Sequence, residues 1–113
     1  MKYIAKHFHE LTVDELFEIY KLRCSVFVVE QSCPYQDVDD ADKVSIHLMA
    51  VDEKGLQGYL RIIPAGVTTD DVSIGRVVVV KRRCGLGENM VLKGIEIVKE
   101  HFNANVVTID AQV

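Results

Sequence analysis

The sequence predicts one α/β (α+β) domain with the order strand, helix, loop, three strands, helix and strand, and three observations support it. Residues 11–27 open with a helix-capping motif and continue with helical apolar spacing. Residues 46–64 form two apolar runs separated by a short polar turn, which is typical of a β-hairpin. Residues 72–102 combine a valine-rich strand, a glycine turn and an amphipathic helix.

The first elements are a strand and a helix. We expect the strand over residues 2–8. In the helix that follows, the side chain of Thr12 can accept a hydrogen bond from the backbone N–H of Glu15, and the Glu15 carboxylate can accept one from Thr12. The helical spacing predicts one buried face, made of Val13, Leu16, Phe17, Tyr20, Cys24 and Phe27.

An acidic loop follows this helix. Pro34 restricts Cys33 to extended or turn geometry, so residues 30–43 are expected to be a loop. The loop carries a run of carboxylates, at Asp37, Asp39, Asp40 and Asp42. Three interpretations stay open: a solvated loop, a rim that attracts a cationic amine, and a calcium loop. The calcium loop is disfavoured because its sixth position needs glycine, and Asp42 stands there.

The second half is expected to supply most of the sheet. Residues 46–51 and 56–64 should pair as the hairpin. The strand over residues 72–80 ends in four consecutive valines, which fits a strand covered on both faces. The helix after the glycine turn should end near Asn103, a residue that tolerates the left-handed C-cap conformation, and a last buried strand spans residues 106–109.

Composition disfavours several classes of function. The formal net charge is −4, which argues against a general binder of nucleic acid or of anionic membranes. The apolar runs are too short to span a membrane, and the first ten residues lack the apolar core of a signal peptide. Three cysteines without CxxC spacing, Cys24, Cys33 and Cys84, favour a reduced, cytoplasmic protein.

The glycine turn is a candidate anion site. A strand that leads through glycines into a helix N-terminus directs free N–H groups and the positive end of the helix dipole at one point. The P-loop pattern is absent, and the dinucleotide pattern GxGxxG fails because Met90 replaces its third glycine. The pattern [Arg/Gln]-x-x-Gly-x-[Gly/Ala] is met by Arg82, Gly85 and Gly87. The alternative is a helix start that uses glycine for turn geometry and arginine for solubility.

This last pattern resembles the pyrophosphate loop of the GNAT superfamily of acyl-CoA-dependent N-acetyltransferases. Residues 23–39, RCSVFVVEQSCPYQDVD, resemble the N-terminal signature of its ElaA-like branch, and residues 74–77 and 110–113 resemble that branch too. The resemblance implies the GNAT fold, a mixed, mostly antiparallel sheet flanked by helices. Residues 1–113 are then expected to be one GNAT domain without its C-terminal third, which in the family holds a tyrosine that can protonate the departing thiolate.

The resemblance also implies a cosubstrate, acetyl-CoA, and no metal. The strand backbone that should pair with the pantetheine arm belongs to Val78, Val79 and Val80. The residues that should surround the pyrophosphate are Arg82, Arg83, Gly85, Leu86, Gly87 and Glu88. This turn is shorter than is usual in the family, so either arginine can occupy the consensus place.

In the implied reaction, a neutral amine attacks the thioester directly, and a base takes the proton of the amine. The candidate catalytic residues are Glu30, His47 and, acting through water, Tyr35. Each has a structural alternative. His47 can be a hydrogen-bonded core residue, and Glu30 can cap a helix or pair with an arginine.

Three charged residues are candidates for binding the substrate: Asp37, Arg61 and Arg76. Both arginines interrupt apolar strands, and a buried arginine is unusual without a partner. Each arginine therefore either pairs with a carboxylate, Glu30 or Asp37, or faces the substrate cleft. We favour the ion pairs.

The leading hypothesis is an acetyl-CoA-dependent N-acetyltransferase that acts on a small-molecule amine or a protein amine, with a homodimer left open. One alternative is an acyl-homoserine-lactone synthase, whose Arg-x-x-x-Phe start matches Arg23 and Phe27. Those enzymes normally carry tryptophans in the N-terminal region, and this chain has none. The other alternative is a non-catalytic module that binds acyl-CoA or a partner chain.

Overall fold

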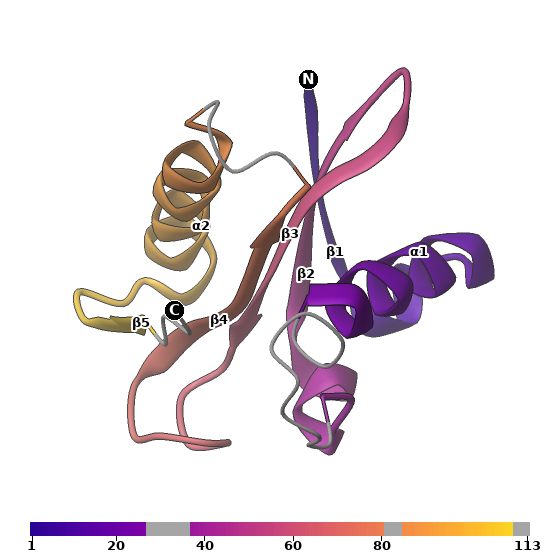
Figure 1. Ribbon diagram of the computed structural model, residues 1–113. Helices are drawn as coiled ribbons and strands as arrows, with labels where there is room; N and C mark the ends of the chain where they lie inside the picture. The colour runs from indigo at the N-terminus through magenta and orange to yellow at the C-terminus, as the bar shows by residue number, and fades with distance from the viewer. Residues whose placement is uncertain (27–36, 81–84, 110–113) are drawn as a thin grey trace.

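The structure, a computed structural model, describes residues 1–26, 37–80 and 85–109 (Figure 1). Its elements are β1 (Lys2–His7), η1 (Phe8–Glu10), α1 (Val13–Arg23), η3 (Asp40–Val44), β2 (Ile46–Asp52), β3 (Gly55–Ile63), β4 (Val72–Val79), α2 (Leu86–Phe102) and β5 (Val107–Ile109). The five strands form one sheet in sequence order, with α1 on one face and α2 on the other. The order of elements predicted from the sequence is confirmed.

The sheet is mixed but mostly antiparallel. β1, β2, β3 and β4 pair antiparallel with their neighbours, whereas β5 runs parallel to β4. The parallel pairing joins Val72 to Val107 and Ile74 to Ile109, and α2 makes the crossover that a parallel pair requires. This is the fold class that the sequence predicts.

The capping motif of α1 forms as expected. The side-chain oxygen of Thr12 accepts the Glu15 N–H at 3.1 Å, and the Glu15 carboxylate accepts the Thr12 N–H at 2.8 Å. These two bonds satisfy backbone donors that a helix start otherwise leaves open.

The buried face of α1 differs from the prediction. Val13 is 85% exposed and Phe17 62% exposed, while Ile19 and Arg23 are fully buried. The spacing of apolar residues also fits a stripe shifted around the helix, and this stripe faces the sheet because Arg23 finds buried carboxylates there. The spacing of apolar residues alone predicted the wrong buried face of α1, because it treats arginine as a surface residue.

The helix α2 follows the sequence prediction closely. Its buried residues are Leu86, Met90, Gly94 and Val98, each four positions after the last. Gly94 lets the helix approach the sheet, since a Cβ there would lie 3.2 Å from Cδ1 of Ile74. Asn103 ends the helix in the left-handed conformation, as expected.

The valine strand is covered less completely than the sequence suggested. Val78 is buried, its two neighbours in β4 are half-buried, and Val80 lies beyond the end of β4 with 52% of its surface exposed. Four consecutive valines therefore do not make a strand covered on both faces here.

Within the described ranges, none of the helices is both long enough and apolar enough to cross a membrane.

Candidate functional site

The glycine turn leads from β4 into the N-terminus of α2. The N–H of Val80 still donates to the Gln57 carbonyl oxygen at 2.8 Å, and Gly85 then starts α2 in the left-handed conformation, at φ +70°. Gly85 has no side chain that could cap the first N–H groups of the helix. This start therefore directs backbone donors and the helix dipole outward, as an anion site requires.

An apolar groove runs beside this helix start. Its volume is about 480 Å³, and it is lined by Val77 of β4 and by Gly87, Glu88, Val91 and Leu92 of α2. A Cβ added to Gly87 would have no described atom within 4 Å apart from its chain neighbours and the nearby backbone of α2, so the space beside this glycine is open. The groove thus joins an apolar wall to the polar start of α2.

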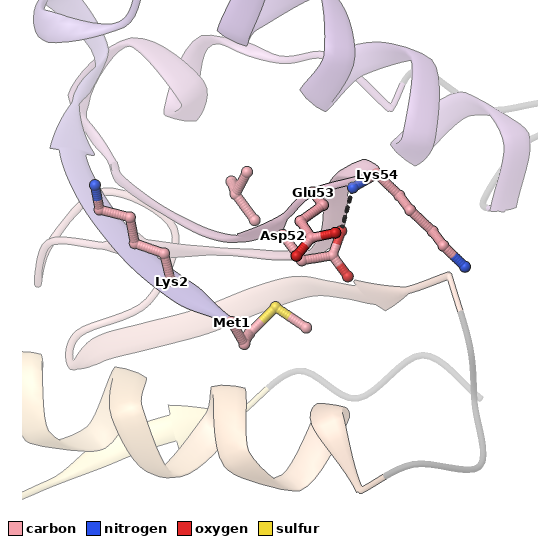
Figure 2. A pocket seen from close by; sticks show the side chains of 6 residues that line it. Met1, Lys2, Asp52, Glu53 and Lys54 are labelled. Atoms are coloured by element: carbon pink, nitrogen blue, oxygen red, sulfur yellow. Dashed lines mark hydrogen bonds between the residues drawn. The ribbon is translucent and has the colours of Figure 1, made fainter.

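A second hollow lies at the tip of the β2–β3 hairpin and offers no comparable arrangement (Figure 2). It is lined by Met1, Lys2, Val51, Asp52, Glu53 and Lys54. The carboxylate of Asp52 accepts the backbone N–H of Lys54 at 2.8 Å, which closes the turn. Its polar groups belong to an exposed turn rather than converging on one point.

The strand β4 is bulged next to the groove. Tyr59 pairs with Val78 and Arg61 with Gly75, so β4 uses one residue more than β3 across this stretch. Arg76 lies in the bulge at φ +53°, a left-handed conformation that is uncommon for residues other than glycine. Bulges redirect backbone groups and side chains, and they are over-represented next to active sites.

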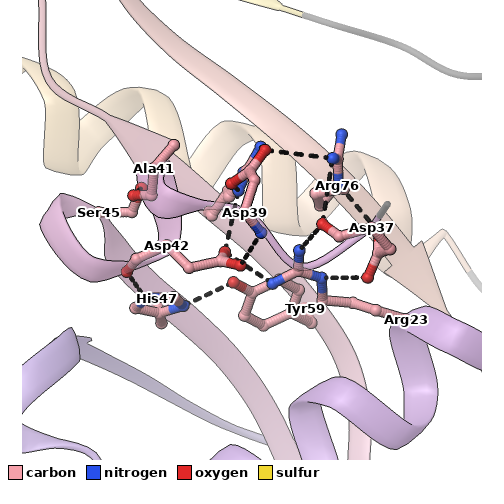
Figure 3. A network of polar contacts seen from close by, with 10 residues as sticks. Arg23, Asp37, Asp39, Ala41, Asp42, Ser45, His47, Tyr59 and Arg76 are labelled. Carbon is pink, nitrogen blue, oxygen red and sulfur yellow. Dashed lines mark hydrogen bonds and ion pairs between the residues drawn. The ribbon is translucent and has the colours of Figure 1, made fainter. Parts of the chain in front are cut away.

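Beside the bulge, three arginines and three aspartates form a closed ring of ion pairs (Figure 3). We call this set the ion-pair ring. Its contacts are Arg23–Asp37 at 3.0 Å, Asp37–Arg76 at 2.9 Å, Arg76–Asp39 at 3.5 Å, Asp39–Arg61 at 2.6 Å, Arg61–Asp42 at 2.9 Å and Asp42–Arg23 at 2.7 Å. Each member contacts two members of opposite charge, so the formal charges of the ring cancel.

The ion-pair ring is shielded from water. The side chains of all three arginines, Asp37 and Asp42 are at most 10% exposed, and only Asp39 reaches the surface. Hydrogen bonds from Arg61 lower the pKa of the Asp39 carboxyl, and the charges of the arginines add to this effect. Asp39 is therefore a carboxylate that holds its charge rather than a proton acceptor.

His47 and Tyr59 extend the ring into the core. The Asp42 carbonyl oxygen can only accept, so the contact of 2.8 Å means that Nε2–H of His47 donates to it. Burial lowers the pKa of His47, so its imidazole is neutral. Its Nδ1 then accepts a hydrogen bond from the hydroxyl of Tyr59 at 2.6 Å. Both nitrogens are engaged in a side chain that is fully buried.

A polar cavity of about 440 Å³ opens where the ring meets the bulge. Arg61 and Arg76 of the ring line it with the exposed edge of Asp39. The rest of its wall comes from strand and loop residues: Ile63, Thr68, Thr69, Ser73, Gly75, Thr108 and Ile109. The cavity therefore reaches the β4 bulge from the face opposite α2.

Known proteins resemble the chain over nearly its whole length. A UPF0039 protein of Schizosaccharomyces pombe is 42% identical over 108 residues, which cover 93% of this chain and 71% of the relative. The protein ElaA of Escherichia coli is 36% identical over 110 residues, which cover 94% of this chain and 72% of the relative. The chain belongs to the ElaA (UPF0039) family. No protein-family model matches it.

Solved structures show the same relationship. The crystal structure of Escherichia coli ElaA superposes with a TM-score of 0.90 at 34% identity, over 99% of this chain and 78% of that one. An acyl-CoA N-acyltransferase of Pseudomonas aeruginosa gives a TM-score of 0.90 at 37% identity, over 98% of this chain and 79% of that one. The ElaA family thus has the GNAT acyltransferase fold that the sequence predicts.

The structure of this ElaA family member separates the residues predicted to bind the cosubstrate. Gly85, Leu86, Gly87 and Glu88 form the start of α2, and Val78 and Val79 belong to β4. Val80 follows β4, and Arg82 and Arg83 lie outside the described residues. Whether these residues hold acetyl-CoA stays a prediction; of them, Gly87 and Glu88 line the groove, whose wall on β4 is Val77.

The candidate catalytic residues divide in a similar way. Glu30 and Tyr35 lie outside the described residues. His47 is buried with both nitrogens engaged, which favours its structural alternative. Arg76 pairs with Asp37 as expected, whereas Arg61 pairs with carboxylates that the sequence analysis did not assign to it.

The acidic loop needs a correction. Asp37 and Asp42 are buried ring members, so the solvated interpretation holds for neither of them. Two partners were not anticipated from the sequence: Arg23, which pairs with both of these carboxylates, and Tyr59, which hydrogen-bonds His47. The sequence does carry one signal for the ring, because the run of aspartates and the arginines within apolar strands have opposite charges.

Among the described residues, no group of three or more histidine, cysteine or acidic side chains is placed to hold a metal.

Proposed function

We propose that this chain is an acetyl-CoA-dependent N-acetyltransferase that acts on a primary amine. The observation that carries the proposal is the start of α2, where Gly85 has no side chain to cap the helix and Gly87 lines an apolar groove together with Val77 of β4. The diphosphate of a CoA thioester suits the helix start, and its pantetheine arm suits the groove. Family membership and the acyltransferase name of the Pseudomonas aeruginosa neighbour support the same chemistry.

The proposed binding mode uses backbone more than side chains. The first N–H groups of α2 would donate to the diphosphate, with Arg82 and Arg83 as additional cations from the preceding turn. The backbone of β4 around Val78, Val79 and Val80 would pair with the amides of the pantetheine arm, as an added strand does. This mode needs a glycine at position 87, because a side chain there would fill the space for the ligand.

In the proposed reaction, the amine nitrogen attacks the thioester carbonyl carbon while a new C–N bond forms. The C–S bond then breaks, the sulfur leaves as the CoA thiolate, and the proton lost from the amine goes to a base. A backbone N–H in the bulged stretch around Arg76 is suited to stabilise the oxygen that becomes negative. Glu30 and Tyr35 are the proposed bases, because His47 is closed off by its hydrogen bonds.

The proposed acceptor site is the polar cavity on the other side of the bulge. Arg61, Arg76 and the edge of Asp39 line it, and Asp37 holds Arg76 from behind. Because the charges of the ion-pair ring cancel, the ring supplies no net attraction for a cationic amine. We therefore expect the rate of acetyl transfer to such an amine to depend only weakly on salt.

The test of the binding site is Gly87→Val. The substitution should abolish calorimetric binding of acetyl-CoA, because the valine side chain occupies the space proposed for the diphosphate. It should leave the circular dichroism spectrum and the melting temperature nearly unchanged, since the structure holds no atom within 4 Å of the added Cβ.

The matched control is Glu100→Val, which places the same side chain at an exposed position near the other end of α2. This variant should bind acetyl-CoA like the wild type. Normal binding by Gly87→Val would contradict the proposed cradle. Binding by the wild type without thiol release over a panel of primary amines would instead favour the non-catalytic module.

A further inference from the structure

The bulge in β4 places a residue in a conformation that its side chain disfavours. Arg76 has φ +53°, and the other non-glycine residue with positive φ in the described ranges is Asn103, which is a helix C-cap. Such a conformation is strained at a residue that carries a side chain. Something in the fold must therefore hold Arg76 in place.

The bulge decides on which face of the sheet Arg76 lies. Before the bulge, Val72 and Ile74 pack in the core beneath α2, and after it Val77 and Val79 do so. Strict alternation from Ile74 would put residue 76 in that apolar core. The extra residue of the bulge instead lets Arg76 share the α1 face with the ion-pair ring.

The ion-pair ring fixes Arg76 at two points. Its Nε lies 2.9 Å from a carboxylate oxygen of Asp37, and its Nη2 lies 3.5 Å from Asp39. Nη2 also donates to the backbone oxygen of Asp37 at 3.2 Å. These aspartates are themselves held by Arg23 from α1 and Arg61 from β3, so the position of Arg76 is set from outside β4.

The bulge and the ring therefore require each other. Without the bulge, the guanidinium of Arg76 would face the apolar core, and the ring would lose one of its three cations. Without the ring, the left-handed conformation at Arg76 would have no compensation, and β4 could return to regular pairing with β3.

We propose that Arg76 is a positioning residue: the ion-pair ring uses it to hold the β4 bulge, so that backbone donors at residues 75–77 face the thioester carbonyl. The proposal rests on the proposed function for the carbonyl, whereas the link between ring and bulge stands without any ligand. Arg76 acts here through the backbone and needs no contact with the acyl group.

The first measurement concerns the free protein. Arg76→Ala removes the ring contacts and keeps the cost of the left-handed conformation, while Arg76→Gly removes both. Backbone ¹³C chemical shifts of residues 75–77 should show the bulge in the wild type and in Arg76→Gly, where positive φ carries no strain, and its loss in Arg76→Ala. Should Arg76→Ala fail to fold, Asp39→Asn gives the test, because it weakens the hold of the ring on Arg76 at the exposed edge of the ring and should move the shifts of residues 75–77 away from the wild-type values.

The second measurement uses acetyl-CoA labelled with ¹³C at the thioester carbonyl. Its stretching frequency should fall on binding to the wild type, because a hydrogen bond polarises the carbonyl. In Arg76→Ala the frequency should return towards that of free acetyl-CoA, while in Arg76→Gly it should stay near the wild-type value, and the Kd of both variants should change by less than about tenfold. A merely structural role of Arg76 would not move the carbonyl frequency at an unchanged Kd.

The control is Asp40→Asn, which removes a fully exposed carboxylate from the same segment without touching the ring. It should match the wild type in both measurements. Wild-type backbone shifts in Arg76→Ala would overturn the link between ring and bulge, and a wild-type carbonyl frequency in that variant would overturn the positioning role. If the wild type bound no acetyl-CoA, the proposed function and the positioning role would both fall, and the backbone shifts would still decide the link between ring and bulge.

Discussion

The two faces of the sheet are buried by different means. Under α2, the core consists of apolar side chains such as Leu60, Ile74, Met90 and Val98. Under α1, a smaller apolar cluster around Ile19 adjoins the ion-pair ring, in which a guanidinium is fully buried. One sheet thus carries an apolar core on one face and a polar network on the other (Figures 1 and 3).

The difference predicts two kinds of response to mutation. Apolar contacts are many, individually weak and non-directional, so the α2 face should lose stability in proportion to the atoms removed. The ring depends on charges that are compensated only while every member is present. Removing one member leaves the others buried without full compensation, so the α1 face should respond to a single change as a unit.

The largest effect is expected for Arg23→Met. The methionine side chain is apolar and of similar length, but within the ion-pair ring Asp37 then keeps Arg76 and Asp42 keeps Arg61, where each had two arginines before. Breaking a buried ion pair in this way costs about 3–5 kcal/mol. Urea unfolding, followed by circular dichroism, should show this loss in the free energy of unfolding.

The matched control is Lys21→Met, which makes a comparable replacement on the exposed side of the same helix. It should change stability by no more than about 0.5 kcal/mol. A loss below about 1 kcal/mol for Arg23→Met would mean that the ring can open to water, and the comparison between the two faces would fail.

The α2 face could be predicted from the sequence because periodicity carries it. Met90, Gly94 and Val98 recur every four residues, and a glycine turn and a left-handed Asn103 delimit the helix. Each of these signals is local, so neighbouring residues suffice to find it. The capping box of α1 was found for the same reason.

The pairing of Arg76 with Asp37 was expected from the sequence, but the complete ion-pair ring could not be predicted because its members come from segments far apart in the sequence. Arg23 and Arg76 meet the same aspartate, Asp37, only after α1 has packed on the face of the sheet to which Arg76 of β4 points. The apolar periodicity of α1 pointed to Val13 and Phe17 instead, since it gives no weight to a buried arginine. Pairing of opposite charges across elements is tertiary information, whereas a charge run taken alone indicates a solvated loop.

A smaller effect is expected for the pH dependence that His47 contributes. In the unfolded chain a histidine binds a proton below a pH of about 6.5, while burial keeps the folded His47 neutral to lower pH. The unfolded state then holds more protons, so stability falls as the pH drops below about 6.5. For one proton the slope cannot exceed about 1.4 kcal/mol per pH unit.

The measurement is the urea midpoint at several pH values between 7.5 and 5. His47→Gln can keep both hydrogen bonds, to Tyr59 and to the Asp42 carbonyl oxygen, without taking up a proton. Its stability should fall less steeply than that of the wild type. His9→Gln, at an exposed position, serves as the control. An unchanged slope in His47→Gln would show that His47 is charged in the folded protein.

The smallest effect is expected on the α2 face, for Ile74→Val. The substitution removes Cδ1, the atom that a Cβ at Gly94 would meet at 3.2 Å, and should cost about 0.5–1.5 kcal/mol. Gly94→Ala alone should be nearly neutral, because its better helix propensity, worth about 1 kcal/mol, is offset by this tight contact. The coupling free energy between the two substitutions should be favourable by at least about 0.5 kcal/mol, since the alanine methyl fills the space left by Cδ1.

A double-mutant cycle of urea unfolding measures this coupling. Strict additivity would mean that the apolar core relaxes around each change separately, whereas the expected coupling would show that this face can be repacked in a way that the ion-pair ring does not permit.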